Sequence, residues 1–288
     1  MRILLTGARG QLGRSLTGRR ADHGPLSWVS TDLEDLDITD PVAVKRFLEQ
    51  SAPDAIVNCA AYTTVDRAEE EPQQAFRINA TGPANLAAAA LERKIPLIHI
   101  STDYVFPGNG TRPYRESDPT GAGTVYGRSK LAGEELVMES GARSVIIRTS
   151  WLYSEFGHNF VRTILRLGRE RESLRVVDDQ SGSPTYAGDL AAAIIRVLSE
   201  LETKPDWPVQ PAVYHFCNTG KATWYELASQ IVRITNLPCR IIPVSTAEYP
   251  QKAARPAYSV LDNSLFRSTF GAQIPNWKES LGICLRQI

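Results

Sequence analysis

A tyrosine and a lysine four residues apart are the side chains best suited to chemistry. Tyr126 and Lys130 lie in a stretch with helical character, so both side chains would share one face of a helix. An ammonium beside a phenol favours the phenolate and lowers the phenol pKa from about 10. We therefore expect Tyr126 to give a proton to a carbonyl oxygen as hydride reaches the carbon, with Lys130 tuning it.

The spacing alone is weak evidence for that chemistry. Ten tyrosines and seven lysines in 288 residues would produce such a pair by chance in roughly one chain in four. The setting adds the weight, because an apolar run at residues 97–101 precedes Thr102 and predicts a strand that ends there. A hydroxyl at that strand end can hydrogen-bond the same carbonyl oxygen. We therefore expect Thr102 to work with Tyr126, rather than Tyr126 and Lys130 lying exposed on a helix.

Three glycines follow the first apolar run of the chain. Gly7, Gly10 and Gly13 form a G-x-x-G-x-x-G pattern between the apolar residues 2–6 and a helical segment that begins at Gln11. Glycines permit the tight turn and the close approach of the backbone to a pyrophosphate, which the first amides of the helix then bind. The pattern predicts a dinucleotide site that includes Gly7, Gly10, Gln11 and Leu12, with a plain turn as the alternative.

An acidic residue at the end of the second predicted strand bears on which dinucleotide binds. Asp32 would accept hydrogen bonds from the adenosine ribose and would repel a 2′-phosphate. Arg9 and Arg14 lie near the same loop and could hold that phosphate, so both NADH and NADPH stay open. We expect Asp37 and Ile38 to cap the adenine ring, although a loop carboxylate beside a core isoleucine is an equal alternative.

Short apolar runs alternate with longer amphipathic segments and predict the elements that position these residues. The expected strands are 3–5, 26–31, 55–58, 97–101, 144–149, 175–177, 213–216 and 240–244. The expected helices are 11–19, 41–50 (capped by Asp40), 66–91 with a bend near Gly82 and Pro83, 126–139, 156–168, 188–198 and 224–235.

This alternation predicts an α/β fold, in which a Rossmann-like doubly wound parallel sheet is joined by a smaller, irregular C-terminal substrate-binding part. Residues 1–150 form the expected NAD(P)-binding Rossmann domain. Residues 151–288 form mainly the substrate-binding part, with some segments returning to the sheet. Loops at the carboxyl ends of the early strands should form the ligand crevice.

The composition bounds the function. Thirty-two basic and 32 acidic residues leave no net charge, which argues against a nucleic-acid-coating role. The cysteines, Cys59, Cys217, Cys239 and Cys284, form no C-x-x-C pair and predict thiols in a reducing compartment rather than a metal site. No stretch approaches the roughly 20 apolar residues of a membrane span, so we expect a cytoplasmic protein without a membrane or nucleic-acid partner.

Several sequence runs together resemble one protein family. They are residues 4–13 (LLTGARGQLG), 58–66 (NCAAYTTVD), 101–108 (STDYVFPG), 126–130 (YGRSK), 148–151 (RTSW), 179–180 (DQ), 183–185 (SPT) and 254–256 (ARP). The chain is similar to the extended short-chain dehydrogenase/reductases, and the STDYVFPG and RTSW runs are typical of their nucleotide-sugar reductases. The matching runs extend through most of the chain.

The resemblance implies roles for particular residues. Tyr126 would be the proton donor, Lys130 its tuner and Thr102 the partner hydroxyl. The remaining implied contacts are Ala60, Ala61, Tyr62, Tyr126 and Lys130 with the cofactor, and Val105, Phe106, Trp151, Asn159 and Arg255 with the nucleotide-sugar. The alternatives are that the apolar residues are simply core and that Arg255 is a solvated loop charge, although a guanidinium suits a diphosphate.

The implied activity is reduction by NADPH or NADH of the 4-keto group of dTDP-4-dehydro-L-rhamnose, which gives dTDP-L-rhamnose for cell-surface polysaccharide biosynthesis. A nucleotide-sugar epimerase or dehydratase of the same fold is one alternative, since Asp103 adjoins Thr102. A non-catalytic regulatory subunit is another.

Some relatives dimerise through magnesium held by glutamates, but here those places hold Ser15 and Gly188, with Asp189 out of register. We therefore expect no metal, and a monomer or weak dimer.

Overall fold

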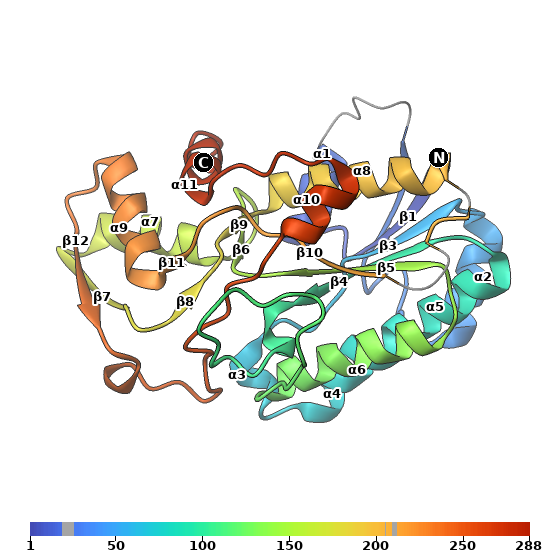
Figure 1. Cartoon of the computed structure of the whole chain (residues 1–288), viewed down its shortest axis with the longest axis horizontal. Coiled ribbons are helices and arrows are strands. Elements are labelled where there is room, and N and C mark those ends of the chain that lie inside the picture. Colours follow the sequence, from blue (N-terminus) through green and yellow to red (C-terminus); the bar gives the residue numbers. More distant parts are fainter. Residues whose placement is uncertain (19–25, 205, 209–211) are drawn as a thin grey trace.

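A computed structural model describes residues 1–18, 26–204, 206–208 and 212–288. Its centre is a six-stranded parallel sheet in the order β10-β5-β4-β3-β1-β2 (Figure 1). The strands are β1 (Arg2–Thr6), β2 (Ser27–Thr31), β3 (Ala55–Asn58), β4 (Leu97–Thr102), β5 (Ser144–Thr149) and β10 (Ala212–His215). The α/β class and the parallel sheet expected from the sequence are confirmed.

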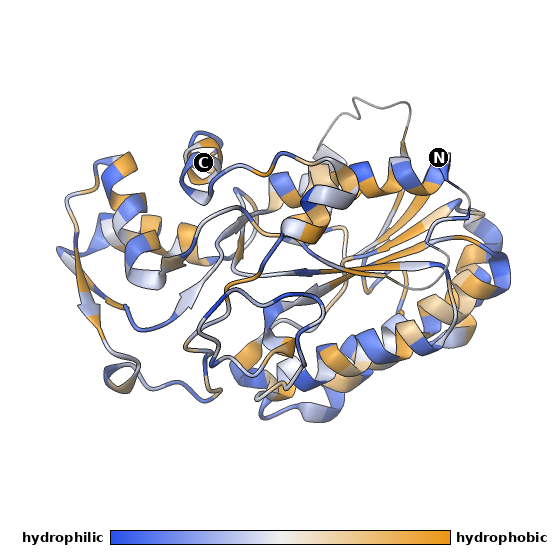
Figure 2. Ribbon diagram, viewed as in Figure 1, coloured by the Kyte–Doolittle hydropathy of each residue, from blue (hydrophilic) through white to orange (hydrophobic). Residues whose placement is uncertain are grey.

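Helices cover both faces of this sheet, because its strands carry apolar side chains on both faces. One face carries α1 (Gln11–Gly18), α8 (Ala187–Thr203) and α10 (Ser264–Phe270), and the other carries α2 (Pro41–Ser51), α5 (Gly82–Arg93) and α6 (Val125–Glu139). Figure 2 shows the apolar strands between helices that each present an apolar and a polar side. Because α6 carries Tyr126 and Lys130, its packing against the sheet fixes the position of both.

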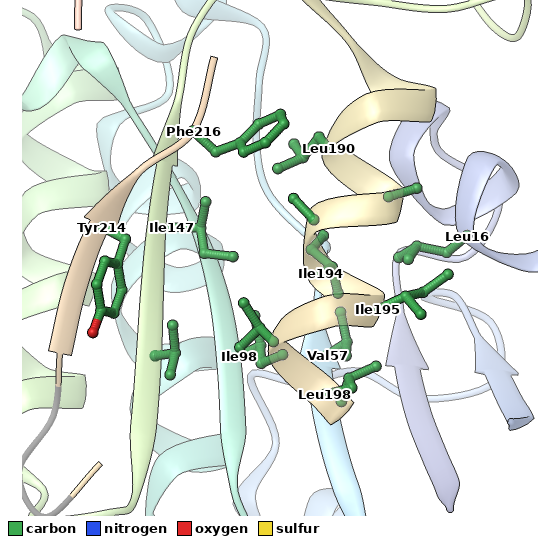
Figure 3. Close-up of a cluster of buried hydrophobic side chains, with 14 of the residues drawn as sticks. Leu16, Val57, Ile98, Ile147, Leu190, Ile194, Ile195, Leu198, Tyr214 and Phe216 are labelled. Atoms are coloured by element: carbon green, nitrogen blue, oxygen red, sulfur yellow. The ribbon is translucent and has the colours of Figure 1, made fainter. Parts of the chain in front are cut away.

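The largest core lies between the sheet and α8. Leu190, Ile194 and Leu198 on that helix face Val57 and Ile98 of the strands, and all five are fully buried (Figure 3). Each such side chain contributes about 1.5–3 kcal/mol relative to exposure. This helix comes from the second half of the chain, as does β10 at the sheet edge. The second half therefore holds the first half's sheet together as well as forming its own lobe.

A smaller lobe is built from short elements around a second core. These are β6 (Leu152–Tyr153), α7 (Phe160–Glu170), β7 (Ser173–Val177), β8 (Ser181–Gly182), β9 (Thr185–Tyr186), β11 (Ala222–Thr223), α9 (Trp224–Thr235), β12 (Arg240–Val244), η3 (Thr246–Glu248) and α11 (Trp277–Leu285). The strands pair only two by two, as β11-β8, β12-β7 and β6-β9. The lobe lies beyond the end of the sheet where β4 and β5 finish (Figure 1).

Several predicted elements differ from the structure. Residues 66–91 are not one bent helix but α3 (Val65–Ala68), α4 (Pro72–Phe76), the π-helix η1 (Arg77–Thr81) and α5. Pro72 explains the break, because proline suits a first helical turn. The helix expected from residue 156 begins at Phe160, since Asn159 caps it. Helices α10 and α11 were not predicted, and the expected end of the first helix, Arg19, lies outside the described residues.

Other predictions agree with the structure. The bounds of α9, β3, β5 and β12 match those expected, and α2 begins under the predicted cap, where Asp40 Oδ1 accepts from the amides of Val42 and Ala43. Among the described helices, none is both long and apolar enough to cross a membrane.

Candidate active site

The glycine loop between β1 and α1 lies directly against the backbone that follows β3. Gly7 has a φ of +66°, and a Cβ there would stand 2.7 Å from the Ala60 nitrogen. A Cβ on Gly13 would stand 2.5 Å from the Gly7 carbonyl oxygen. The first helical hydrogen bond runs from the Arg14 amide to the Gly10 carbonyl, so the earlier amides of α1 face outward without a helical acceptor. This loop therefore fits a pyrophosphate at the start of α1.

Replacing Gly13 by alanine should disrupt this loop. The new Cβ would meet backbone atoms, which cannot move aside as a flexible side chain could, so we expect Gly13→Ala to weaken dinucleotide binding at least tenfold and to lower thermal stability. Gly18 in the same helix is the matched control, because nothing lies within 4 Å of a Cβ there. Gly18→Ala should bind normally and be slightly more stable. Calorimetric titration with NADP⁺ and thermal melts check both variants; equal binding by Gly13→Ala would contradict this account.

Charged residues gather where β2 ends. Asp32 Oδ2 accepts from the Arg9 backbone amide at 3.0 Å, which ties this carboxylate to the glycine loop. The Arg9 guanidinium pairs with Glu34 at 2.9 Å and reaches Asp35 at 4.0 Å. The Arg14 guanidinium lies over a phenyl ring instead, 4.2 Å from its centroid. Both arginines considered for a 2′-phosphate therefore have protein partners already.

Asp37 and Ile38 occupy different surroundings. The Asp37 carboxylate accepts from the backbone and hydroxyl of Thr39 and pairs with Arg77 at 3.2 Å; these hydrogen bonds lower its pKa. Ile38 is 5% exposed, and its side chain fills the space above Gly82, where a Cβ would come within 2.6 Å. Ile38 thus has the packing of a core residue, and its contact with adenine stays a prediction.

The segment after β3 is held to the helix that carries Tyr126. The Tyr62 amide donates to Asn79 Oδ1 at 2.8 Å, and Asn79 Nδ2 donates to Ser129 Oγ at 2.9 Å. Ser129 in turn donates to the Tyr126 carbonyl at 2.8 Å. Residues 60–62, including Ala61, are therefore fixed beside α6. Their contact with a dinucleotide stays a prediction.

Thr102 and Tyr126 meet where β4 ends. Thr102 lies close enough to the Tyr126 phenol to act on its pKa, and Thr102 Oγ1 donates to Asp103 Oδ1 at 3.0 Å. The ring of Tyr104 packs edge-on against that of Tyr126, with centroids 5.4 Å apart. Burial raises the pKa of Tyr126 to about 12 and that of Asp103 to about 6. Tyr126 therefore keeps its proton at neutral pH, as a proton donor must.

Lys130 lies one helical turn from Tyr126 but interacts elsewhere. Its Nζ donates to the Ile100 carbonyl at 2.7 Å and lies 3.3 Å from His99 Nε2. Burial lowers the pKa of Lys130 to about 8. We expected this lysine to lower the pKa of Tyr126. That prediction is wrong for this structure, because burial raises the pKa of the phenol and Lys130 is not among the charges that act on it. The role of Lys130 in the reaction stays a prediction.

Two of the residues expected to touch the sugar nucleotide are core residues. Val105, in the 3₁₀ turn η2 (Asp103–Val105), is fully buried and Phe106 is 2% exposed. Phe106 stacks on Tyr114 with centroids 4.4 Å apart and lies beneath the Arg148 guanidinium. The core alternative describes both better, and their contact with substrate stays a prediction.

Trp151 and Asn159 lie in the smaller lobe. Trp151 has a φ of +45° and stacks on Trp224 with centroids 3.5 Å apart. A positive φ on so large a residue stores strain, which is common where side chains are aimed at a ligand. Asn159 caps α7, and its Nδ2 donates to Gln11 Oε1 at 2.8 Å. Gln11 thus joins the glycine loop to the smaller lobe.

Arg255 is paired rather than solvated. Its Nη2 lies 2.6 Å from Asp66 Oδ2, and the same carboxylate accepts from the Ala253 amide at 3.0 Å. The Arg255 side chain is 16% exposed. Lys252 pairs with Glu70 beside it. Residues 252–255 are therefore fastened to α3, next to the segment that follows β3.

Comparison with known proteins identifies the family. The family model described as RmlD substrate binding domain matches residues 1–288. The chain belongs to this family. It is 40% identical over 296 residues to dTDP-4-dehydrorhamnose reductase of Escherichia coli, covering 100% of this chain and 98% of that protein. It is also 40% identical over 283 residues to a probable dTDP-4,6-dihydroxy-2-methyloxan-3-one 4-ketoreductase of Streptomyces antibioticus, covering 98% of this chain and 93% of that protein.

Solved structures of other proteins superpose on the whole chain. A dTDP-4-dehydrorhamnose reductase from Bacillus anthracis in complex with NADP has a TM-score of 0.93 at 39% identity and covers 100% of this chain and 99% of its own. A UDP-glucose 4-epimerase from Thermus thermophilus complexed with NAD has a TM-score of 0.83 at 18% identity, covering 100% of this chain and 98% of its own, which shows a shared fold alone. The expected family is therefore confirmed.

The positions considered for magnesium in this reductase family carry other interactions here. Ser15 Oγ donates to the Gln11 carbonyl at 3.0 Å. Gly188 lies at the start of α8, where a Cβ would meet the Tyr186 ring. Asp189 Oδ2 accepts from Asn218 at 2.7 Å and from Ser280. In the described parts of the chain, no three His, Cys, Asp or Glu side chains gather as a metal site.

Sequence reasoning missed the buried polar residues behind the site. Asn58 and His99 are fully buried in neighbouring strands, and their side chains lie 3.0 Å apart. Glu134 and Arg148 form a buried ion pair between α6 and β5 at 2.6 Å. A signal existed for the strand residues, because Asn58, His99 and Arg148 lie within or at the end of apolar runs, and buried polar groups require partners. The partners themselves become apparent only when the strands are placed side by side.

Proposed function

We propose that this protein uses NADPH or NADH to reduce the 4-keto group of dTDP-4-dehydro-L-rhamnose, giving dTDP-L-rhamnose. The observation that carries the proposal is Thr102 at the end of β4, close to a buried, protonated Tyr126, together with a glycine loop that fits a pyrophosphate. Full-length similarity at about 40% identity to reductases of this substrate supports it.

The dinucleotide supplies the hydride when it is bound. The amides at the start of α1 bind its pyrophosphate, and Asp32 accepts from its adenosine ribose. Thr102 turns its single hydroxyl proton from Asp103 to the ketone oxygen and so orients that oxygen towards the phenol. Tyr126 gives its proton to that oxygen as the carbon is reduced, so a ketone becomes a secondary alcohol. The Lys130 ammonium, one turn along α6, would hold the nicotinamide ribose.

The direct assay supplies the 4-keto sugar to the purified protein. We would incubate dTDP-4-keto-6-deoxyglucose with its 3,5-epimerase, this protein and NADPH, and follow the loss of NADPH absorbance. The expected result is one NADPH oxidised per sugar, only when the epimerase is present. Failure to oxidise either NADPH or NADH would overturn the proposed reduction.

Asp32 provides a prediction about cofactor choice. Its carboxylate would repel a 2′-phosphate, and Asp32→Asn removes the charge while keeping an oxygen for the Arg9 amide. Loss of one repulsion of about 1 kcal/mol should raise the NADPH-to-NADH ratio of kcat/KM roughly fivefold. Steady-state kinetics with both dinucleotides measures this ratio. Glu34→Gln is the matched control, because it removes one negative charge nearby without changing the residue expected to bind the ribose. An equal rise of the NADPH-to-NADH ratio in both variants would show a general charge effect instead.

A nucleotide-sugar epimerase or dehydratase is the second candidate, because one observation favours it. Asp103 is 2% exposed, adjoins Thr102 and has a pKa raised to about 6 by burial, which suits a carboxylic acid that exchanges protons. Such an enzyme would retain a tightly bound dinucleotide and consume none. The same assay separates the two, since sugar conversion without net NADPH oxidation would favour this candidate.

The remaining proposals concern setting and partners. Four free thiols suit a reducing compartment, and we place the reaction in the cytoplasm. The partner is a nucleotide-sugar, with neither nucleic acid nor membrane, and the protein acts as a monomer or weak dimer. A regulatory subunit without activity is disfavoured by the complete set of Thr102, Tyr126 and Lys130. Light scattering at several protein concentrations tests the oligomeric state.

A further inference from the structure

A chain of buried polar side chains runs from the first strand of the sheet to Lys130. Thr6 Oγ1 donates to Asn58 Oδ1 at 2.6 Å. Asn58 Nδ2 lies 3.0 Å from His99 Nδ1, and His99 Nε2 lies 3.3 Å from Lys130 Nζ. All four side chains are at most 2% exposed. The reaction steps above use Lys130 but leave Asn58 and His99 without a role.

The orientation of the Asn58 amide is fixed by a backbone group. The Ala60 N–H can only donate, and it lies 3.1 Å from Asn58 Oδ1. The Thr6 hydroxyl donates to the same oxygen. Rotating the amide by half a turn would place its NH₂ group against the Ala60 N–H, with two donors facing each other. The Nδ2 group of Asn58 must therefore face His99.

This orientation selects the tautomer of His99. Asn58 Nδ2 only donates, so His99 Nδ1 must accept and carries no proton. Burial, and then the neighbouring Lys130, lower the pKa of His99 well below its ordinary value, so the ring is neutral. The single ring proton is therefore on Nε2. That Nε2–H points at Lys130 Nζ.

The Nε2–H of His99 shifts the balance of Lys130 from the ammonium towards the neutral amine. An ammonium has three donors and no acceptor, so it cannot bond a ring N–H at 3.3 Å. The neutral amine can accept from His99 and still donate to the Ile100 carbonyl at 2.7 Å. Both contacts are then satisfied in a site where unpaired polar groups are costly.

We propose that His99 is a positioning residue that sets the protonation state of Lys130 through its Nε2–H. The consequence for catalysis rests on the proposed reduction, in which the Lys130 ammonium would hold the nicotinamide ribose. Three other titratable groups face Lys130: Glu134 on the same helix, the Cys59 thiol after β3, and His99 itself. Glu134 is already paired with Arg148, and burial raises the pKa of Cys59 to about 12, so it stays a neutral thiol. His99 is thus the neighbour that opposes the ammonium most directly.

The consequence is a pH limit on activity that His99 determines. Reduction needs the ammonium, so the rate falls as pH rises through the pKa of Lys130, which burial lowers to about 8. Replacing Asn58 by aspartate offers His99 Nδ1 an acceptor in place of a donor. The ring proton should then reside on Nδ1, and Nε2 should accept from the Lys130 ammonium. Asn58→Asp should therefore move the basic limb of kcat upward by about one pH unit.

Nitrogen NMR of the ¹⁵N-histidine-labelled full chain, without added dinucleotide, tests the tautomer directly. The expected result is a protonated Nε2 and a bare Nδ1 for His99. His215 is the internal control with the opposite tautomer, because its Nδ1 faces the Tyr114 carbonyl at 3.1 Å and its Nε2 faces Arg148. A protonated Nδ1 on His99 in the wild-type protein would overturn the proposal.

Carbon NMR of ¹³C-lysine-labelled protein measures the titration of Lys130. The Lys130 resonance, assigned with Lys130→Met, should titrate near pH 8 in the wild type and about one unit higher in Asn58→Asp. A wild-type midpoint at the ordinary lysine value overturns the proposal even if Asn58→Asp fails to fold. An inactive wild-type protein with the expected tautomer and midpoint would contradict the proposed reduction while leaving the role of His99 intact.

Discussion

Tyr126→Phe is expected to lower kcat by ~10²- to 10⁴-fold, the range that a positioned general acid contributes. The phenol is buried, protonated at neutral pH and close to Thr102, and phenylalanine keeps the ring against Tyr104. NADP⁺ should still bind with nearly unchanged affinity, because the glycine loop is untouched. Stopped-flow single turnovers and calorimetric titration with NADP⁺ measure the two quantities separately.

Tyr114→Phe is the matched control for that loss. The Tyr114 hydroxyl is buried without a hydrogen-bond partner, and its ring stacks on Phe106 away from the hydroxyl pair. The variant should keep wild-type kcat and equal or greater stability, since it removes an unsatisfied polar atom. A Tyr126→Phe enzyme that retained the rate of Tyr114→Phe would mean that another group donates the proton.

Glu134→Gln is expected to lower the free energy of unfolding by about 3–5 kcal/mol, because it leaves the Arg148 guanidinium buried without its counter-charge. The two side chains are 2% and 6% exposed and are joined at 2.6 Å. The pair fixes α6, which carries Tyr126 and Lys130, to β5. Urea denaturation followed by circular dichroism measures the loss, which is a large share of a typical total stability.

Two further variants distinguish the cost of an unpaired buried charge from the cost of a lost contact. Arg166 and Glu170 form an exposed pair on α7, and Glu170→Gln should change stability by less than about 0.5 kcal/mol. The double variant Glu134→Leu with Arg148→Met removes both buried charges and should recover most of the stability lost in Glu134→Gln. If the double variant is less stable than the single one, the cost lies in lost packing rather than in an unpaired charge.

The sheet and its main helices were predictable because their local signals are strong. The apolar run that ends at Asn58 marks a strand with the bounds that the structure shows, and the proline after Asp40 marks the observed start of α2. Helices α10 and α11 were missed because they have only seven and nine residues. Asn263 before α10 makes no side-chain cap, so the chain offers little sequence pattern at its start.

The candidate site likewise has features that were predictable from the sequence and features that were not. Its motif residues were predictable, since glycines and the Tyr126–Lys130 spacing act through local geometry. The direction of the Tyr126 pKa shift was not, because it depends on burial, which is set by segments distant in sequence. The pairing of Arg255 with Asp66 joins residues 189 positions apart, and no local pattern predicts such a partner.

Product analysis with deuterated cofactor tests the central claim most directly. The purified protein would be incubated with dTDP-4-keto-6-deoxyglucose, its 3,5-epimerase and NADPH carrying deuterium at C4 of the nicotinamide, and the sugar examined by NMR. The account predicts dTDP-L-rhamnose with deuterium at C4 of the sugar and one NADP⁺ per product. A converted sugar without deuterium, or a substrate left unchanged in the presence of both dinucleotides, would contradict it.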